Sequence, residues 1–281
     1  AAARGRPSSA MMSLRRMRAA TRMASLRALL ERFGQATQDT FEEIGRFWSI
    51  LGRALYWAVR PPFDPKQWVR QMVRVGVDSL PVVGLTAAFT GAVLALQTFT
   101  GFARFNAEGY VGSVVSLSLT RELAPVLTAL MIAGRIGSSL AAELGSMRVT
   151  EQIDALTAMA TQPVQYLVVP RVMACTLMLP FLVSFADLLG IGGGYFVAVK
   201  LMGANPIVYW DRTFQYLEVN DVSSGLIKAA VFGLIIGTTG CTKGYYAGGG
   251  AEGVGRATTS AVVMSSLVIL LSDFFLTKIL F

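Results

Sequence analysis

The run LPVVGLTAAFTGAVLALQTF, residues 80–99, decides the fold class of this chain. It carries no charge, and its length matches the roughly 20 residues that a helix needs to cross a bilayer. Further apolar runs lie at residues 114–142, 172–199, 223–242 and 257–281. We therefore predict an all-α integral membrane protein with five transmembrane helices.

The composition supports this class and excludes several kinds of chemistry. Hydrophobic residues make up 53% of the 281 residues and charged residues only 15%, which is too apolar for an ordinary soluble domain. The chain has no histidine, which excludes histidine-dependent catalysis and histidine metal ligation. Cys175 and Cys241 both lie in or beside apolar runs, which argues against a disulfide framework or a metal site.

The positive charge is concentrated ahead of the first apolar run. Residues 1–78 hold 14 basic residues against 6 acidic ones, and the rest of the chain is balanced. Such a basic flank stays on the cytoplasmic side, which predicts a cytoplasmic N-terminus. Because this flank adjoins a membrane domain, we expect anionic lipid headgroups as its counter-charge and no nucleic acid. Residues 1–36 are typical of a disordered basic tail or a transit segment, of which we favour the tail. Residues 37–281 form the membrane domain.

Residues 40–60 predict an amphipathic helix that lies in the membrane interface. Phe41 and Trp48 fall on one helical stripe, while three arginines recur at seven-residue spacing on another. The alternative is a sixth, tilted span. Pro61 then breaks the helix, and Asp64 followed by Pro65 indicates the start of a short helix that leads into the first span.

Ionisable residues inside the apolar runs are the main functional candidates, because charge is costly in hydrocarbon. Arg121 and Glu122 open the second run, Lys228 lies in the fourth and Asp273 in the fifth, while Asp187 lies alone in the third. The first four sum to zero charge, and their order along alternating spans places all four in the outer half. We expect them to pair across helices, either as a network that only fixes helix register or as the polar floor of a cavity for an amphiphile.

The second span carries two more charges nearer its cytoplasmic end, Arg135 and Glu143, which we assign to packing or coupling. Gly137, Ala141 and Gly145 recur at four-residue spacing there, which predicts a ridge for close helix contact.

The stretch GGGAEGVGRATT, residues 248–259, satisfies G-x-G-x-x-G but is not a nucleotide site. The dinucleotide motif needs a preceding strand and a βαβ unit, whereas this stretch lies between two apolar runs. We interpret it as a flexible inner loop. If ATP drives transport, another chain must hydrolyse it.

Residues 148–159 predict a short cytoplasmic helix after the second span. Arg148, Glu151, Gln152 and Asp154 are its polar residues. The helix is either an interfacial connector or a docking helix for a cytoplasmic partner.

Several of these motifs together resemble one family. The segments LTRELAPVLTALMIAGRIGSSLAAELGSMRVTEQIDAL, QPVQYLVVPRVMA, GLIKAAVFG and GGGAEGVGRATTSAVVMSSLVILLSDFFLTKILF are similar to the MlaE (YrbE) permeases of lipid ABC transporters, in order and spacing. The resemblance implies a homodimer, cytoplasmic ATPase subunits, an external ring of mammalian-cell-entry (MCE) domain proteins and, in bacteria, a small STAS-domain protein.

The resemblance also assigns roles to individual residues. It implies a lipid cavity at the dimer interface whose polar residues are Arg121 and Glu122 in TREL, Lys228 in LIKAAVF and Asp273 in SDFFLT. It also implies that VTEQIDAL is the coupling helix, with its acidic residues facing the ATPase.

From these observations we expect the permease subunit of an ATP-driven phospholipid transporter in a bacterial inner membrane. The chain itself would hold no cofactor, and ATP and Mg²⁺ would bind the partner ATPase. The long arginine-rich start keeps a chloroplast inner envelope open as the alternative location. Two other functions stay open as well: an ion-coupled secondary transporter in which Glu122 and Asp273 relay protons, and a non-transporting membrane scaffold.

Overall fold

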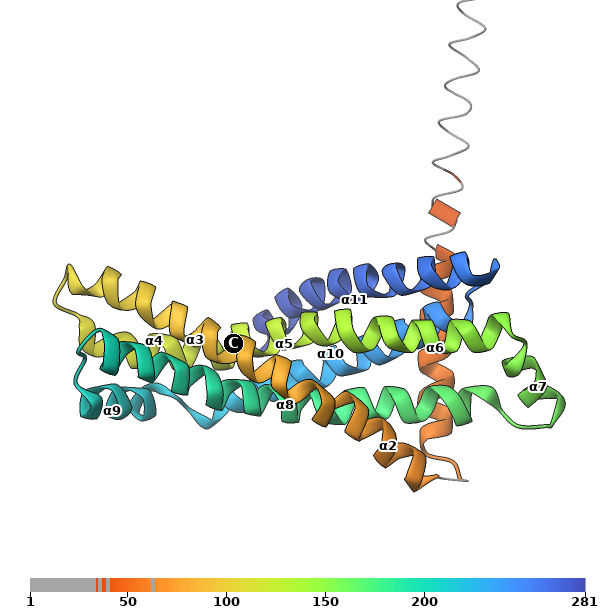
Figure 1. The fold of residues 1–281 in the computed structure, drawn as a ribbon, viewed down its shortest axis with the longest axis horizontal. Coiled ribbons are helices and arrows are strands. Elements are labelled where there is room, and N and C mark those ends of the chain that lie inside the picture. The colour runs from red at the N-terminus through yellow and green to blue at the C-terminus, as the bar shows by residue number, and fades with distance from the viewer. Residues whose placement is uncertain (1–33, 35–36, 39–40, 62–63, 281) are drawn as a thin grey trace, which may run out of the picture. The chain divides into compact units, whose positions relative to one another are not determined.

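The computed structural model describes residue 34 and residues 37–38, 41–61 and 64–280, and these residues form helices joined by short connections (Figure 1). The chain divides into two compact units at residues 49 and 50. Residues 41–58, across this boundary, are helical where the sequence predicts a helix over 40–60. That this helix lies in the membrane interface stays a prediction. The predicted basic tail falls almost wholly outside the described residues.

Among the described residues, five segments are long and apolar enough to cross a membrane, which confirms the predicted number of spans. Each is longer than the apolar run that predicts it, because polar and aromatic turns continue the helix beyond the hydrocarbon-compatible part. The segments are Pro65–Ala103, Glu108–Val149, Val164–Leu201, Val219–Tyr245 and Gly250–Leu280.

The first segment begins where Asp64 and Pro65 predict. The Asp64 carboxylate accepts hydrogen bonds from the backbone N–H groups of Lys66 and Gln67 at 3.1 and 3.3 Å, which satisfies donors that a helix start leaves unpaired. The segment consists of α2 (Pro65–Val75), the short 3-10 helix η1 (Val77–Ser79) and α3 (Leu80–Ala103).

The second segment alternates between α-helix and π-helix. Two π turns interrupt it, and such turns are frequent at functional sites because they re-aim side chains. Its parts are η2 (Glu108–Tyr110), α4 (Val111–Ser118), the π turn η3 (Leu119–Leu123), α5 (Ala124–Ile132), the π turn η4 (Ala133–Gly137) and α6 (Ser138–Val149).

The described residues after the second segment form five α-helices and two further π turns. The stretch expected as a flexible loop over residues 248–259 is mostly helix, because Gly249 and Gly250 make the turn with positive φ and α11 starts at Gly250. The elements are α7 (Gln152–Ala158), η5 (Val164–Val168), α8 (Val169–Tyr195), η6 (Phe196–Leu201), α9 (Pro206–Tyr216), α10 (Val219–Tyr245) and α11 (Gly250–Leu280).

Glycines let α10 lie close against its neighbours at the centre of the bundle, where α8 contacts both α3 and α10. A Cβ at Gly233 would lie 2.4 Å from the carbonyl oxygen of Cys175 on α8, so no larger residue fits without a shift. Gly240 and Gly244 approach the backbones of Gly137 and Ala141 in the same way. These contacts confirm the predicted small-residue ridge of the second span.

The buried fraction differs strongly between the spans. Of the five, α10 is the most buried and α11 the least, and the first segment is also largely uncovered. Large apolar side chains are exposed on both α3 and α11, among them Leu85 and Phe89 on α3 and Leu267 and Phe274 on α11. These two helices therefore present the faces that lipid or another subunit would cover.

Candidate functional site

Lys228 of α10 is the centre of a charged group that we call the lysine cluster: Glu122, Lys228, Asp273 and Thr277. The side chain of Lys228 is fully buried, and its Nζ lies 2.8 Å from Glu122 Oε1 and 3.1 Å from Asp273 Oδ1. It also donates a hydrogen bond to the Thr277 hydroxyl at 2.7 Å. Three elements therefore meet here, η3, α10 and α11. The predicted pairing across helices is confirmed for Glu122, Lys228 and Asp273.

Thr277, which the sequence did not single out, connects the members of the lysine cluster. Its hydroxyl oxygen lies 3.0 Å from Glu122 Oε1 and 2.8 Å from the Asp273 carbonyl oxygen, within donor range of both. Thr277 lies four residues after Asp273, so one face of α11 supplies both groups. This spacing is the signal that could have identified it.

The chain also provides a backbone acceptor for Lys228. Pro125 has no N–H, so it cannot donate the α-helical hydrogen bond to the carbonyl of Arg121, four residues earlier. Lys228 Nζ donates to that carbonyl at 3.0 Å. The π turn η3 and the proline that follows it therefore present the Arg121 carbonyl oxygen to Lys228 on the neighbouring helix α10. The buried ammonium group of Lys228 needs such acceptors to offset its desolvation.

The Arg121 side chain lies elsewhere than predicted, which corrects part of the expected network. Its guanidinium binds Asp221 Oδ1 at 2.7 Å. Asp221 is almost fully buried at the start of α10, and its other oxygen accepts from the backbone N–H of Glu218 at 3.0 Å. Asp221 lies outside the apolar run that starts at residue 223, which is why the sequence did not identify it as the partner.

The lysine cluster has one cation for two carboxylates. Glu122 keeps 38% of its side chain exposed and Asp273 19%, whereas Lys228 keeps none. The excess negative charge is therefore on the exposed side of the cluster. Asp187 belongs to neither this cluster nor another, because it is buried in α8 and its Oδ1 has no hydrogen-bond partner among the described residues.

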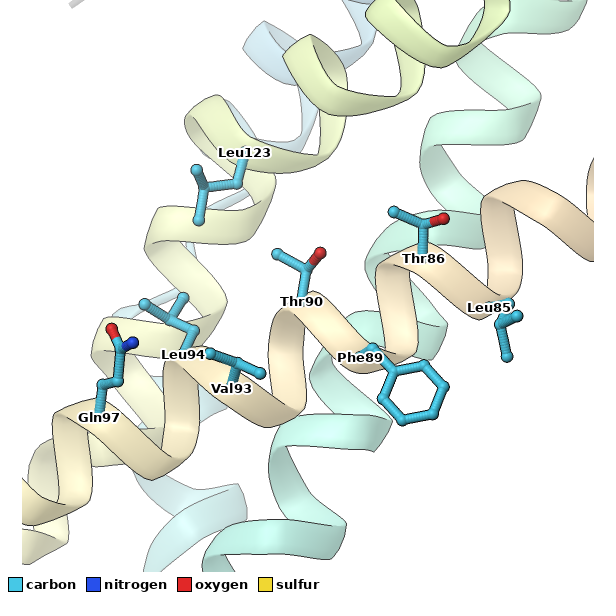
Figure 2. Close-up of a pocket in the computed structure, with 8 residues that line it drawn as sticks. All are labelled: Leu85, Thr86, Phe89, Thr90, Val93, Leu94, Gln97 and Leu123. Atoms are coloured by element: carbon cyan, nitrogen blue, oxygen red, sulfur yellow. The ribbon is translucent and has the colours of Figure 1, made fainter.

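A groove of about 600 Å³ runs along α3 (Figure 2). Figure 2 shows its side chains along one stripe of α3, with Leu123 of η3 across from them. Leu123 directly follows Glu122 in the chain, so η3 contributes one residue to the groove and the next to the lysine cluster. The lining is mostly apolar and consists of Leu85, Thr86, Phe89, Thr90, Val93, Leu94, Gln97 and Leu123.

The groove was not predicted, although the sequence carries a signal for it. Thr86, Thr90 and Gln97 are the polar residues that line it, and their spacing places them on one face of an otherwise apolar helix. A polar stripe in a membrane helix indicates a face that avoids lipid tails.

A second charged group lies between α2, α6 and α8, and we call it the arginine cluster: Arg74, Ser139, Glu143 and Arg171. Arg171 Nη2 binds Glu143 Oε1 at 2.8 Å, and Arg74 Nη1 binds Glu143 Oε2 at 2.6 Å. Arg74 also donates to the Ser139 hydroxyl at 2.8 Å. Glu143 therefore joins α2, α6 and α8, which agrees with packing, one of its two predicted roles, while the role in coupling stays a prediction.

The predicted coupling helix over residues 148–159 is two pieces in the structure. Arg148 lies in the last turn of α6, Glu151 adopts a positive φ of 61° in the turn, and Gln152 and Asp154 lie in the short helix α7. The break falls there because α6 ends at Val149 and the chain reverses through a left-handed residue.

The structure brings the two ends of this turn together. Arg148 Nη1 binds Asp154 Oδ1 at 2.6 Å across the turn, and Gln152 donates to the Thr150 hydroxyl at 3.0 Å. The side chain of Ile153 is buried against the bundle, while Glu151, Gln152 and Asp154 are exposed. The turn therefore presents a polar surface that is anchored by one apolar residue.

In the part of the chain that the structure describes, no group of three or more acidic residues or cysteines could hold a metal ion.

These features define a multi-pass α-helical membrane protein with a charged cluster buried between its spans. The chain belongs to the MlaE permease family, because the family model described as Permease MlaE matches residues 68–279.

Individual relatives agree with this family. A "Probable ABC transporter permease protein" of Rickettsia felis is 51% identical over 88% of this chain and 96% of its own length. A protein of the same description from Synechocystis is 43% identical over 86% of this chain and 92% of its own. "Protein TRIGALACTOSYLDIACYLGLYCEROL 1, chloroplastic" of Arabidopsis thaliana is 37% identical over 83% of this chain and 66% of its own.

Proposed function

We propose that this chain is the permease subunit of an ABC transporter that moves phospholipid between membranes. The observation that carries the proposal is its membership of the MlaE family, whose relatives bear the name of ABC transporter permeases. The chain would contribute the membrane path, and ATP and Mg²⁺ would act in a cytoplasmic ATPase subunit. The name of the chloroplast relative, which refers to a glycolipid, supports a lipid as the transported substance.

The substrate path would combine the α3 groove with the lysine cluster. A phospholipid has apolar chains and a charged head, and here η3 contributes Leu123 to a mostly apolar groove and Glu122 to a group of buried charges. The groove is open on one side, so a second copy of the chain would close it and form a cavity at a homodimer interface. This arrangement explains why charged residues are retained at membrane depth.

The turn between α6 and α7 would receive the force from the ATPase. Glu151, Gln152 and Asp154 are exposed there, and Arg148 ties α6 to α7. When the ATPase subunits close, they would move this turn and, through α6, the second segment that carries Glu122. The cavity would narrow and transfer lipid to or from an external ring of MCE-domain proteins. A STAS-domain protein would bind the ATPase.

The charge pattern and the relatives support a location in a bacterial inner membrane. The basic flank ahead of α2 favours a cytoplasmic N-terminus, and five spans then place the C-terminus outside. The match covers nearly the whole length of the bacterial relatives, which supports a bacterial inner membrane. The chloroplast relative keeps the inner envelope as the alternative.

Reconstitution tests this function directly. The chain is purified with its co-purifying proteins, placed in liposomes, and assayed for ATP-dependent transfer of a fluorescent phospholipid to acceptor vesicles. We expect transfer with ATP and none with a proton gradient alone. Transfer driven by the gradient through the isolated chain would instead establish the ion-coupled transporter in which Glu122 and Asp273 relay protons.

A pair of variants separates transport from scaffolding. Glu122→Gln removes one carboxylate beside Lys228, and Glu108→Gln removes a carboxylate that is exposed at the start of the same segment. We expect the first to lower ATP-dependent transfer at least about tenfold and the second to leave it unchanged, since only the first alters a buried ion pair. If assembled Glu122→Gln protein transfers lipid at the normal rate, the cluster serves only as a scaffold.

A further inference from the structure

Among the residues that the structure describes, the arginine cluster and its surroundings have an excess of positive charge. Two guanidinium groups, those of Arg74 and Arg171, share the single carboxylate of Glu143. One turn away, Arg135 donates to the neutral Ser79 hydroxyl at 2.5 Å. Asp78 is the neighbouring acid on η1, and it is exposed. Three arginines therefore face two carboxylates here, which leaves a net positive charge that an anion could offset.

The three arginines differ in what they expose. Arg171 is 2% exposed, donates to the Leu167 carbonyl and to Glu143, and its Nε has no hydrogen-bond partner among the described residues. Arg74 keeps 40% of its side chain exposed, and Arg135 is exposed. Arg171 therefore holds Glu143 in place, while Arg74 and Arg135 retain guanidinium surface for an external anion.

Arg74 and Arg135 are held about one helical turn apart along the second segment. Arg74 reaches from α2 to Ser139 on α6, and Arg135 reaches from η4 back to Ser79 on η1. Since Arg135 and Ser139 are four residues apart, the two bridges lie about 5 to 6 Å apart along the second segment. A phosphate group, with several acceptor oxygens, is the ligand that two guanidinium groups at this spacing bind best.

The cluster also lies at the depth of lipid headgroups. Tyr110, in ring contact with Tyr216, marks an aromatic group at one end of the second segment, and such groups lie at the membrane interface. Arg135 follows 25 residues later, or about 37 Å along the axis. Because the hydrocarbon core is about 30 Å thick, Arg135 reaches the opposite interface. Lys66 and Arg70 precede Arg74 at four-residue spacing on α2, and both are exposed.

We propose that Arg74 and Arg135 bind the phosphate of a membrane phospholipid in the leaflet next to α2, with Arg171 and Glu143 as the buried support. This site is separate from the lysine cluster and is defined by binding alone. It therefore does not depend on the proposed transport, and its failure would leave that proposal intact.

Native mass spectrometry of the full-length chain tests the site without ATP. The chain is released from detergent micelles that contain phosphatidylglycerol, or diacylglycerol with the same acyl chains and no phosphate. We expect retained phosphatidylglycerol in the unaltered chain and an apparent affinity lower by at least about tenfold in Arg74→Gln/Arg135→Gln, since charge-assisted hydrogen bonds are lost. Diacylglycerol retention should be the same in both.

Arg104→Gln is the matched control, because Arg104 is exposed at the far end of α3 and its loss removes one charge without touching the cluster. An equal loss of phosphatidylglycerol in this variant would overturn the proposal, as would unchanged retention in the double variant. Millimolar inorganic phosphate provides the remaining comparison. If it displaces the phospholipid completely, the site takes the free anion and the lipid assignment is wrong.

A label on the unaltered chain covers the case in which the double variant does not fold. A phosphatidyl probe with a photoreactive group in its headgroup is incorporated and cross-linked. We expect labelled peptides from residues 70–79 and 131–139. Labelling confined to other parts of the chain would overturn the proposal.

Discussion

The lysine cluster and the arginine cluster each contain a buried cation, but the excess charge of the two clusters has opposite sign. In the first, one ammonium group that is fully buried faces two partly exposed carboxylates. In the second, one partly exposed carboxylate binds two guanidinium groups, one buried and one not. Each cluster therefore buries a cation completely and leaves its excess charge toward the surface. The excess is negative at Lys228 and positive at Glu143.

The difference indicates what each cluster can attract. Two carboxylates offset the charge of Lys228, whereas the positive charge of Arg74 and Arg171 is offset by only one. An anionic headgroup would therefore be held firmly at the arginine cluster and only weakly on the proposed transport path past the lysine cluster. Each cluster also has a π turn at or beside it. Glu122 of the lysine cluster lies in η3, and η4, which carries Arg135, directly precedes the helix α6 with Ser139 and Glu143. In each case the turn aims a charged side chain toward a neighbouring helix. The predictions that follow test how far the two clusters are equivalent.

Lys228→Met should have the largest effect. It leaves Glu122 and Asp273 close together without their cation, and breaking a buried pair in this way costs about 4 kcal/mol. We expect a lower midpoint of thermal unfolding in detergent and loss of ATP-dependent lipid transfer. The control is Lys278→Met, because Lys278 is exposed on the same helix as Asp273. Equal stability of the two variants would show that Lys228 is not required to hold the carboxylates.

Glu143→Gln should have a smaller effect at the other cluster. It leaves the Arg171 guanidinium buried without its carboxylate, at a cost of about 2 to 3 kcal/mol, because Glu143 is itself partly exposed. Thermal unfolding of Glu143→Gln, Arg171→Met and the double variant measures the coupling between them. If the single losses simply add in the double variant, the two groups do not support each other.

Gly225→Ala tests how tightly the lysine cluster is assembled. A Cβ at Gly225 would lie 2.4 Å from the Thr120 carbonyl oxygen, and Gly225 precedes Lys228 by three residues. Forcing α10 away from η3 should cost about 2 kcal/mol and slow transport. Gly134→Ala is the comparison, since no atom lies within 4 Å of its Cβ position. A fully stable Gly225→Ala variant would mean that the helices separate there without cost.

The sequence predicted the spans and the lysine cluster because hydrocarbon restricts what a membrane helix carries. Uncharged runs of sufficient length have few alternatives to a helix, and charges inside them must find partners. Lys228 therefore pointed to Glu122 and Asp273, since alternating spans place them at one level. The partner of Arg121 could not be found by this argument, because Asp221 lies at a helix start, where a carboxylate serves equally well as a cap.

The α3 groove and the arginine cluster depend on the rotation of each helix about its axis. That rotation is set by contacts such as those of Gly233 and Gly240 with neighbouring backbones, which appear only in the folded bundle. Arg171 lies at the edge of an apolar run, where a sequence pattern does not separate a buried arginine from one at the surface. The break between α6 and α7 depends on the left-handed conformation of Glu151, which no residue preference indicates.

Thr277→Val removes only a hydroxyl from the lysine cluster. Lys228 loses one of its neutral partners, and the cost should be about 1 kcal/mol in the free energy of unfolding. Thr277→Ser keeps the hydroxyl and should restore most of the stability. If Thr277→Ser is as unstable as Thr277→Val, the methyl group and not the hydrogen bond is what matters.

Arg148→Gln should affect stability least and yet affect transport. The Arg148 and Asp154 side chains are 38% and 59% exposed, and an ion pair of this kind contributes at most about 0.5 kcal/mol. If the turn between α6 and α7 couples the permease to an ATPase, its geometry matters more than its stability. We therefore expect nearly unchanged thermal unfolding, but lipid transfer that falls while the partner continues to hydrolyse ATP.

The matched control for this last variant is Arg256→Gln, which breaks the exposed pair of Arg256 with Glu252 in the first turns of α11. Both variants remove one arginine from an exposed ion pair, so they change charge and stability alike, and only Arg148 joins α6 to α7. Equal lipid transfer per ATP in the two variants would exclude the turn as the coupling element. A loss in Arg148→Gln alone would place coupling at the end of the segment that also carries Glu122 and Glu143, and so connect both clusters to the ATPase through one helix.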